Sequence, residues 1–132
     1  MQDRPDLAEL LDSVRLFLED EVLPAVSDAR LKFRARVAAY VLAVAARERR
    51  QEGPLLEAEW RRLAAILGPL DSAPTDSSES PQARVASRNE LLARAIRSGA
   101  IDASPGTPVW DHLRLAAFEK VQIANPAKLR TK

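Results

Sequence analysis

The sign of the charge reverses across one short segment near the start of the chain. Residues 1–29 carry eight acidic and two basic side chains, whereas residues 30–50 carry seven basic and one acidic. The acidic run Glu19 to Glu21 precedes Pro24, and a basic group follows it, formed by Arg30, Lys32, Arg34 and Arg36. The helix dipole disfavours negative charge at a C-terminus and positive charge at an N-terminus. Each group is therefore unfavourably placed at the end of its own helix. It would be neutralised by the other group across a hairpin, or by a charged partner.

The first helix is expected to begin after Asp6, which forms a capping box with Glu9 three residues later. Pro24 is expected to end it, because the residue before a proline avoids the helical region. A second helix is expected to begin near Ser27 or Asp28 and to run to about residue 51, with Gly53 as its cap.

The middle of this second helix, residues 37–46, is apolar almost all round. Such a pattern indicates a central helix that is contacted on several sides. Replacing Val41 or Val44 by aspartate is therefore expected to bury an unpaired charge and to unfold the domain.

Proline and glycine mark three further helices, over residues 54–67, 83–98 and 108–124. Residues 69–82 have the composition of a mobile loop, and residues 127–132 are expected to form a flexible tail. Short connections favour antiparallel neighbours. The sequence thus predicts a single all-α domain over residues 1–132, an antiparallel bundle of about five helices.

Composition argues against most kinds of reactive site. There is no cysteine and only one histidine, so neither a thiol nucleophile nor a multi-histidine metal site is expected. No phosphate-binding loop, metalloprotease or nucleophile-elbow motif is present. We expect no catalytic residue, metal or cofactor. Without a signal sequence or an apolar run of about 20 residues, a cytoplasmic location and no membrane partner are expected.

Two alternatives to a non-enzymatic protein stay open. His112 could serve a small acyl-CoA-handling enzyme as a general base, although a partly exposed structural histidine is favoured. A nucleic-acid-binding regulator would use the basic side chains of the fourth helix, Arg84, Arg88, Arg94 and Arg97. The formal net charge of +1 makes nucleic acid an unfavoured partner.

The basic group allows two interpretations. Arg30 with Arg34, and Lys32 with Arg36, are like-charge pairs four residues apart, so each pair needs neutralisation or a ligand. The acidic end of the first helix could neutralise them. Alternatively they form an anion site for phosphate or the CoA diphosphate, in which Arg34 and Arg36 matter most because nearby apolar residues partly bury them.

Three segments resemble a bacterial family of small uncharacterised helical proteins, encoded beside aminoglycoside-phosphotransferase-like kinases and acyl-CoA dehydrogenases. They are QDRPDLAELLDSVRLFLEDEVLPA, FRARVAAYVLAVAARE and LRLAAFEKVQIANP. Tyr40 stands where asparagine is expected in such sequences. The resemblance implies a non-catalytic accessory subunit of a kinase that acts on hydroxyacyl-CoA substrates, with ATP and magnesium held by the kinase. Homo-oligomers stay open.

Overall fold

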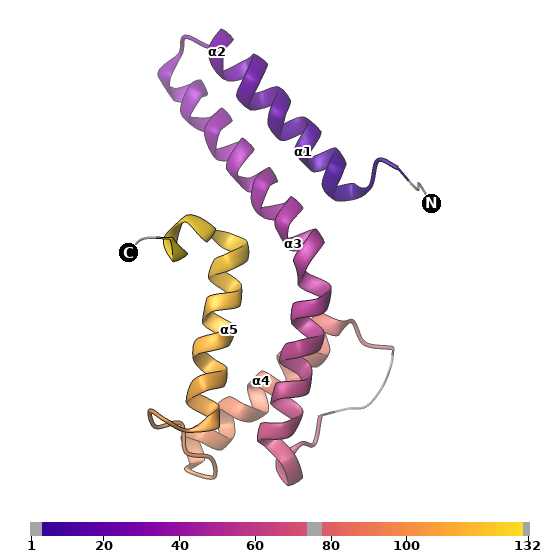
Figure 1. Ribbon diagram of the computed structural model, residues 1–132, viewed down its shortest axis with the longest axis vertical. Coiled ribbons are helices and arrows are strands. Elements are labelled where there is room, and N and C mark those ends of the chain that lie inside the picture. Colours follow the sequence, from indigo (N-terminus) through magenta and orange to yellow (C-terminus); the bar gives the residue numbers. More distant parts are fainter. Residues whose placement is uncertain (1–3, 74–77, 131–132) are drawn as a thin grey trace. The chain divides into compact units, whose positions relative to one another are not determined.

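The computed structural model describes residues 4–73 and 78–130, and every regular element in these ranges is a helix (Figure 1). The all-α prediction is confirmed. The described residues fall into two compact units. The hairpin unit lies within Met1–Glu52 and Ile123–Lys132, and the core unit within Gly53–Gln122. The elements are α1 (Leu7–Phe17), a π turn (Leu18–Val22), α2 (Leu23–Ala25), α3 (Ala29–Leu67), a 3₁₀ turn (Gly68–Leu70), α4 (Pro81–Ser98), α5 (Pro108–Ala124) and a 3₁₀ turn (Pro126–Leu129).

The first helix begins as its capping box predicts. The Asp6 carboxylate accepts the Glu9 N–H at 2.8 Å, and the Glu9 carboxylate accepts the Asp6 N–H at 2.8 Å. Its predicted end at Pro24 is wrong, because the helical path continues to Ala25. Pro24 lacks an N–H and would collide with a carbonyl one α-turn earlier. The wider π turn before it, closed by the Leu23 N–H on the Leu18 carbonyl, gives the ring space.

The predicted second and third helices are one helix. α3 runs for 39 residues from Ala29 to Leu67, with Pro54 in its interior. Asp28 caps its start, since its carboxylate accepts the Leu31 N–H at 2.7 Å. Gly53 and Pro54 are exposed, so water can bind the Arg50 carbonyl that Pro54 leaves without a donor. The Gly53-Pro54 pair therefore does not break the helix.

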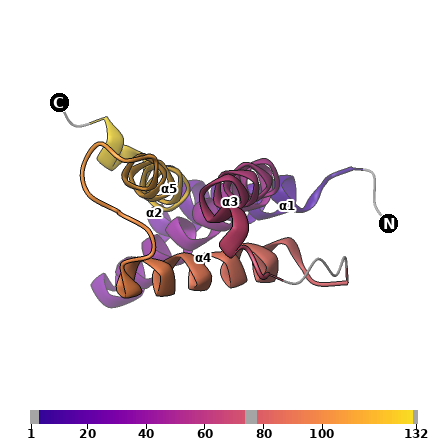
Figure 2. The ribbon, with the colours of Figure 1, turned by 90° about the horizontal axis from the view of Figure 1, so that it is seen from below.

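The main hydrophobic cluster lies in the core unit. Its buried side chains are Leu63 and Leu67 from α3, Val85 and Leu92 from α4, and Val109 from α5. Figure 2, which looks along α3 and α5, shows α4 lying across them. Leu56 and Trp60 pack against the cluster, as their helical spacing predicts. The two tryptophans of the chain, Trp60 and Trp110, both belong to this unit.

The hairpin unit has a different interior. α1 runs beside the first half of α3 (Figure 1), and the described side chains buried in this unit are all alanine. They are Ala8, Ala35, Ala39 and Ala46. The expectation that residues 37–46 are covered on several sides is wrong: Val41, for example, is 57% exposed. Of this run only Ala39 and Ala46 are buried.

The remaining boundaries follow local turn chemistry. α4 begins at Pro81, two residues earlier than expected, because the Ser80 hydroxyl caps it by accepting the Ala83 N–H. Gly99 ends it with a φ of 78°, and Thr107 caps α5 as predicted, accepting the Trp110 N–H. Part of the predicted mobile loop, residues 74–77, lies outside the described residues, as do residues 131–132 of the expected tail.

Candidate partner-binding surface

The predicted basic group occupies the first two turns of α3. Arg30, Arg34 and Arg36 are exposed and Lys32 is half-buried. Within the described residues no ion pair joins any of them to Glu19, Asp20 or Glu21. Glu19 instead pairs with Arg15, four residues before it, at 2.7 Å. Glu19 is thus paired within its own helical segment, and not with the basic group as intramolecular neutralisation requires.

Helix geometry divides the basic group into two pairs. Successive residues of an α-helix are 100° apart, so Arg30 and Arg34 share one flank of α3, while Lys32 and Arg36 lie on a nearly opposite flank. Arg34 and Arg36 are about 200° apart and cannot hold one phosphate together. The expected partial burial beside them is also wrong, because Phe33 is 64% exposed.

The first half of α3 presents three faces. One carries the buried alanines, Ala35, Ala39 and Ala46. A second is met by the C-terminal segment: the Tyr40 hydroxyl donates to the Ala124 carbonyl at 2.6 Å, and Arg47 Nε donates to the Ile123 carbonyl at 2.8 Å. On the third, which we call the outer α3 face, no side chain forms a hydrogen bond or ion pair with another described residue. This face consists of Leu31, Arg34, Ala38, Val41 and Ala45.

α1 carries a similar surface. Its large apolar side chains recur three and four residues apart and stand exposed. This α1 stripe consists of Leu7, Leu10, Val14 and Phe17. Spacing of this kind places the four side chains along one side of a helix, as in the seam of a coiled coil. Spacing of this kind shows that one side of the helix is apolar, but not whether another helix covers that side.

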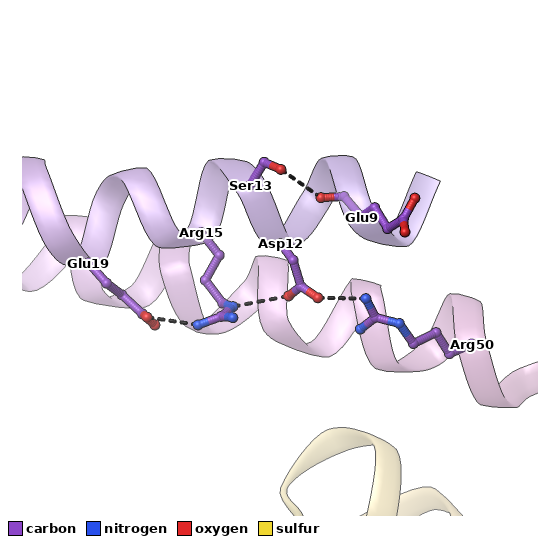
Figure 3. A network of polar contacts seen from close by, with 6 residues as sticks. All are labelled: Glu9, Asp12, Ser13, Arg15, Glu19 and Arg50. Atoms are coloured by element: carbon purple, nitrogen blue, oxygen red, sulfur yellow. Dashed lines mark hydrogen bonds and ion pairs between the residues drawn. The ribbon is translucent and has the colours of Figure 1, made fainter. Parts of the chain in front are cut away.

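A polar network joins α1 to α3 within the hairpin unit (Figure 3). Asp12 lies between two arginines, 2.6 Å from Arg50 Nη2 and 3.1 Å from Arg15 Nε. Hydrogen bonds first from Arg50 and then from Arg15 lower the pKa of the Asp12 carboxyl. Nothing in the spacing of Asp12 and Arg50, 38 residues apart, identified this contact beforehand.

His112 lies inside the core unit and is 3% exposed, so the expectation of a partly exposed histidine is wrong. Arg62 Nε donates to its Nδ1 at 3.4 Å, and Arg62 also forms two bonds with Glu119, the shorter at 2.6 Å. Desolvation, followed by the charge of Arg62, lowers the pKa of His112. A buried neutral imidazole of this kind offers a dissolved substrate little access as a general base.

The arginines of α4 are engaged within the protein. Arg84 and Arg88 lie over the Trp60 ring, 4.5 and 4.1 Å from its centre. Arg88 is buried and pairs with Asp71 at 2.7 Å. Arg84 and Arg88 lie one helical turn apart, so their spacing is compatible with a shared target, but the sequence alone does not identify that target as a tryptophan.

The other two arginines of that helix also have intramolecular contacts. Arg94 pairs with Glu90 at 2.5 Å, and Arg97 Nε donates to the Ala93 carbonyl at 3.2 Å. The four side chains named for nucleic-acid binding therefore do not form a free phosphate-binding row.

Two further kinds of site are absent from the described ranges. Residues 4–73 and 78–130 contain no group of three or more His, Asp or Glu side chains placed to hold a metal ion. No helix in the same ranges is both long and apolar enough to cross a membrane.

Comparison with known protein families gives one match, over residues 24–128, to DUF6285, a domain of unknown function. The chain belongs to the DUF6285 family. The matched region includes the basic group, the outer α3 face and all of α4 and α5, whereas α1 precedes it. No curated protein and no solved structure matches the chain. The match confirms that the chain belongs to a family of uncharacterised proteins.

Proposed function

We propose that this DUF6285 protein is a non-catalytic accessory subunit that binds an aminoglycoside-phosphotransferase-like kinase acting on hydroxyacyl-CoA substrates. One observation carries the proposal. The hairpin unit buries only alanine among its described side chains, while eleven larger apolar side chains of that unit stand exposed. A surface of this kind is typical of a protein that completes its apolar packing on a partner.

The energetic argument rests on side-chain size. Covering a Leu, Val or Phe side chain contributes about 1.5–3 kcal/mol, whereas an alanine has a single methyl group to bury. The intramolecular contacts of α1 with α3 therefore leave most of the available hydrophobic free energy unused, and a partner that covers the exposed residues would gain it.

Within this surface we assign the kinase to the side of α3 that carries Phe33 and Val37. By helix geometry Arg30 and Arg36 flank these two side chains. Neither arginine has an ion pair in the described residues, so both can meet acidic groups of a partner. Charged groups around an apolar centre are the usual anatomy of a protein interface. If the basic group binds a CoA diphosphate instead, helix geometry restricts that ligand to one of its two pairs.

The identity of the partner rests on the resemblance. The similar segments lie in the first 50 residues and the last third of the chain, and they include Arg34 and Arg36 of the basic group. In this proposal the kinase holds ATP and magnesium, and the DUF6285 chain supplies a helical surface that stabilises the kinase or completes its acyl-CoA pocket.

Co-purification tests the proposal. A tagged chain is expected to retain the kinase encoded beside it, and Phe33→Asp or Arg36→Ala is expected to release that kinase without changing the helix content of the tagged chain. Leu115→Asp is the matched control, because Leu115 is an exposed leucine of α5 in the core unit. Its kinase retention should equal that of the unmodified chain.

The result that would overturn the proposal is also specific. It is a chain that never retains the kinase but turns over an acyl-CoA by itself, with the turnover abolished by His112→Gln. A salt-dependent affinity for nucleic acid, lost when Arg94 and Arg97 are replaced, would equally overturn it.

A further inference from the structure

We propose that the hairpin unit binds a second copy of this chain, with the α1 stripe of each copy packed on the outer α3 face of the other. The product is a four-helix bundle in which all neighbouring helices are antiparallel. This inference goes beyond the kinase interaction and does not depend on it, because its apolar contacts lie on a different side of α3. Of the basic group, only Arg30 borders both sides.

The two surfaces match in spacing. The α1 stripe recurs at intervals of three, four and three residues, and the outer α3 face at intervals of three, four, three and four. Helices with this alternation pack side by side at a small crossing angle. Ala38 and Ala45 leave space on α3 into which the larger side chains of α1, such as Val14 and Phe17, can fit.

On the outer α3 face no side chain forms a hydrogen bond or ion pair with another described residue, and this face is separate from the side of Phe33 and Val37 that we assign to the kinase. The alanine face is buried in the hairpin, and the Tyr40 side contacts the C-terminal segment. Leu31 and Val41 on the outer face are both more than half exposed.

Charge favours a second copy over an unrelated helix. From residue 7 to residue 25 the chain has five acidic side chains and one basic, and from residue 29 to residue 50 it has seven basic and one acidic. Each hairpin therefore offers both an acidic and a basic helix. A two-fold axis parallel to the helices brings α1 of each copy beside α3 of the other. The exposed Asp20 and Glu21 then lie near the exposed Arg30 and Arg34 of the second copy.

The first experiment measures the mass of the purified full-length chain by sedimentation or light scattering. We expect a dimer with twice the 14.5 kDa mass of one chain. Val14→Asp would bury a charge in the interface and should weaken dimerisation by roughly a hundredfold. Leu16→Asp is the matched control: Leu16 is 47% exposed and Val14 is 51% exposed, but Leu16 lies off the α1 stripe.

The Leu16→Asp control shows which results would contradict the proposed dimer. Leu16→Asp should stay dimeric, and both variants should keep the helix content of the original chain. A monomeric original chain, or a Leu16→Asp variant as weakly associated as Val14→Asp, would overturn the arrangement.

The second experiment exchanges the charges. One variant carries Asp20→Lys and Glu21→Lys, and the other carries Arg30→Glu and Arg34→Glu. Each alone places like charges opposite each other and should dimerise roughly tenfold more weakly, from the modest contribution of exposed ion pairs. In the mixed dimer one contact pairs the new lysines with the new glutamates, and the other keeps the original pairing of Asp20 and Glu21 with Arg30 and Arg34, so mixing should restore association.

If the mixture associates as weakly as each variant alone, the proposed pairing of α1 with α3 of the second copy is ruled out. A chain that dimerises but never retains the kinase would leave this inference standing while it removes the proposed function. A chain that retains the kinase as a monomer would do the reverse.

Discussion

Several buried charged or polar side chains of the core unit contact a partner from another element. Arg88 of α4 pairs with Asp71 and donates to the Trp60 carbonyl, and Glu59 of α3 accepts from Asn89 of α4. His112 is less well satisfied, because its Nε2 has no hydrogen-bond partner among the described residues. Burying such a group is costly unless its neighbours compensate, so His112 is the residue at which pH should affect stability.

We expect the core unit to lose stability as the pH falls below 6.5, the ordinary histidine pKa. The folded protein holds His112 neutral at pH values where the unfolded chain already binds a proton. Because the unfolded state binds more protons in this range, the free energy of unfolding rises with pH. Above the range neither state holds the proton, and no stability is lost. Tryptophan fluorescence during urea unfolding at about pH 7.5 and about pH 5.5 measures the effect.

The control for this prediction is His112→Gln, which cannot bind the proton and should show a smaller difference between the two pH values. Arg62, Glu59, Glu119 and Lys120 are the charged groups that act on His112, and the variant leaves all four in place. A wild-type chain equally stable at both pH values would contradict the prediction.

Asp12→Asn is expected to weaken the attachment of α1 to α3. Asp12 lies between Arg15 and Arg50, and its side chain is a quarter exposed, so the loss should be about 1 kcal/mol or less. Because the hairpin buries only alanine among its described residues, even this loss should be visible as faster hydrogen exchange in α1. Exchange in α4 should stay unchanged, and equal acceleration in both helices would contradict a local role.

At the scale of elements, the chain passes two prolines without leaving the helical path. The turn before Pro24 widens to a π turn, and α3 continues through Pro54. At the preceding residue, Gly53, a methyl group in place of the hydrogen would have no atom within 4 Å other than those of its chain neighbours, and the φ angle is not positive. The ring of Pro54 is one of those neighbours, and it disfavours a β-carbon on a helical residue that precedes it.

Gly53→Ala is accordingly expected to stabilise α3 by less than the roughly 0.5–1 kcal/mol that alanine gains over glycine elsewhere in a helix interior, because the Pro54 ring offsets part of the entropy gain. Thermal unfolding followed by circular dichroism measures the change. Gly99→Ala is the contrasting variant: Gly99 has a φ of 78°, so an added side chain there should destabilise the protein. A gain as large as about 1 kcal/mol in Gly53→Ala would contradict this steric effect of the Pro54 ring.

At the scale of the molecule, the two units differ in what they bury. The core unit buries leucine and valine from three helices, and the described part of the hairpin unit buries alanine. Large-to-small substitutions should consequently have their greatest effect in the core unit, and charged substitutions on the apolar run of α3 should be tolerated by the fold.

Leu63→Ala is expected to lower the free energy of unfolding by about 2–5 kcal/mol, because Leu63 is 0% exposed and its truncation leaves a cavity. Val41→Asp, by contrast, should not unfold the core unit, which reverses the expectation from sequence. Fluorescence of Trp60 and Trp110 reports on this unit alone. A fully unfolded Val41→Asp variant would show that the first half of α3 is covered after all.

Local sequence determined where most helices begin and end and that the fold is all-α. The capping groups Asp6, Asp28 and Thr107 and the C-terminal Gly99 act within one turn of their own positions, so they can be recognised without a structure. The same local reasoning identified the start of α3 as basic.

Only the tertiary structure decided which apolar stripes are buried. Periodicity shows that Leu63 and Val41 each belong to an apolar side of a helix, but it contains nothing about whether another helix covers that side. The partners of charged residues were equally undetermined, because Asp12 meets Arg50 and Arg62 meets Glu119 across long separations in sequence. Burial and ion pairing depend on where distant segments meet, and that is decided by the packing of whole helices.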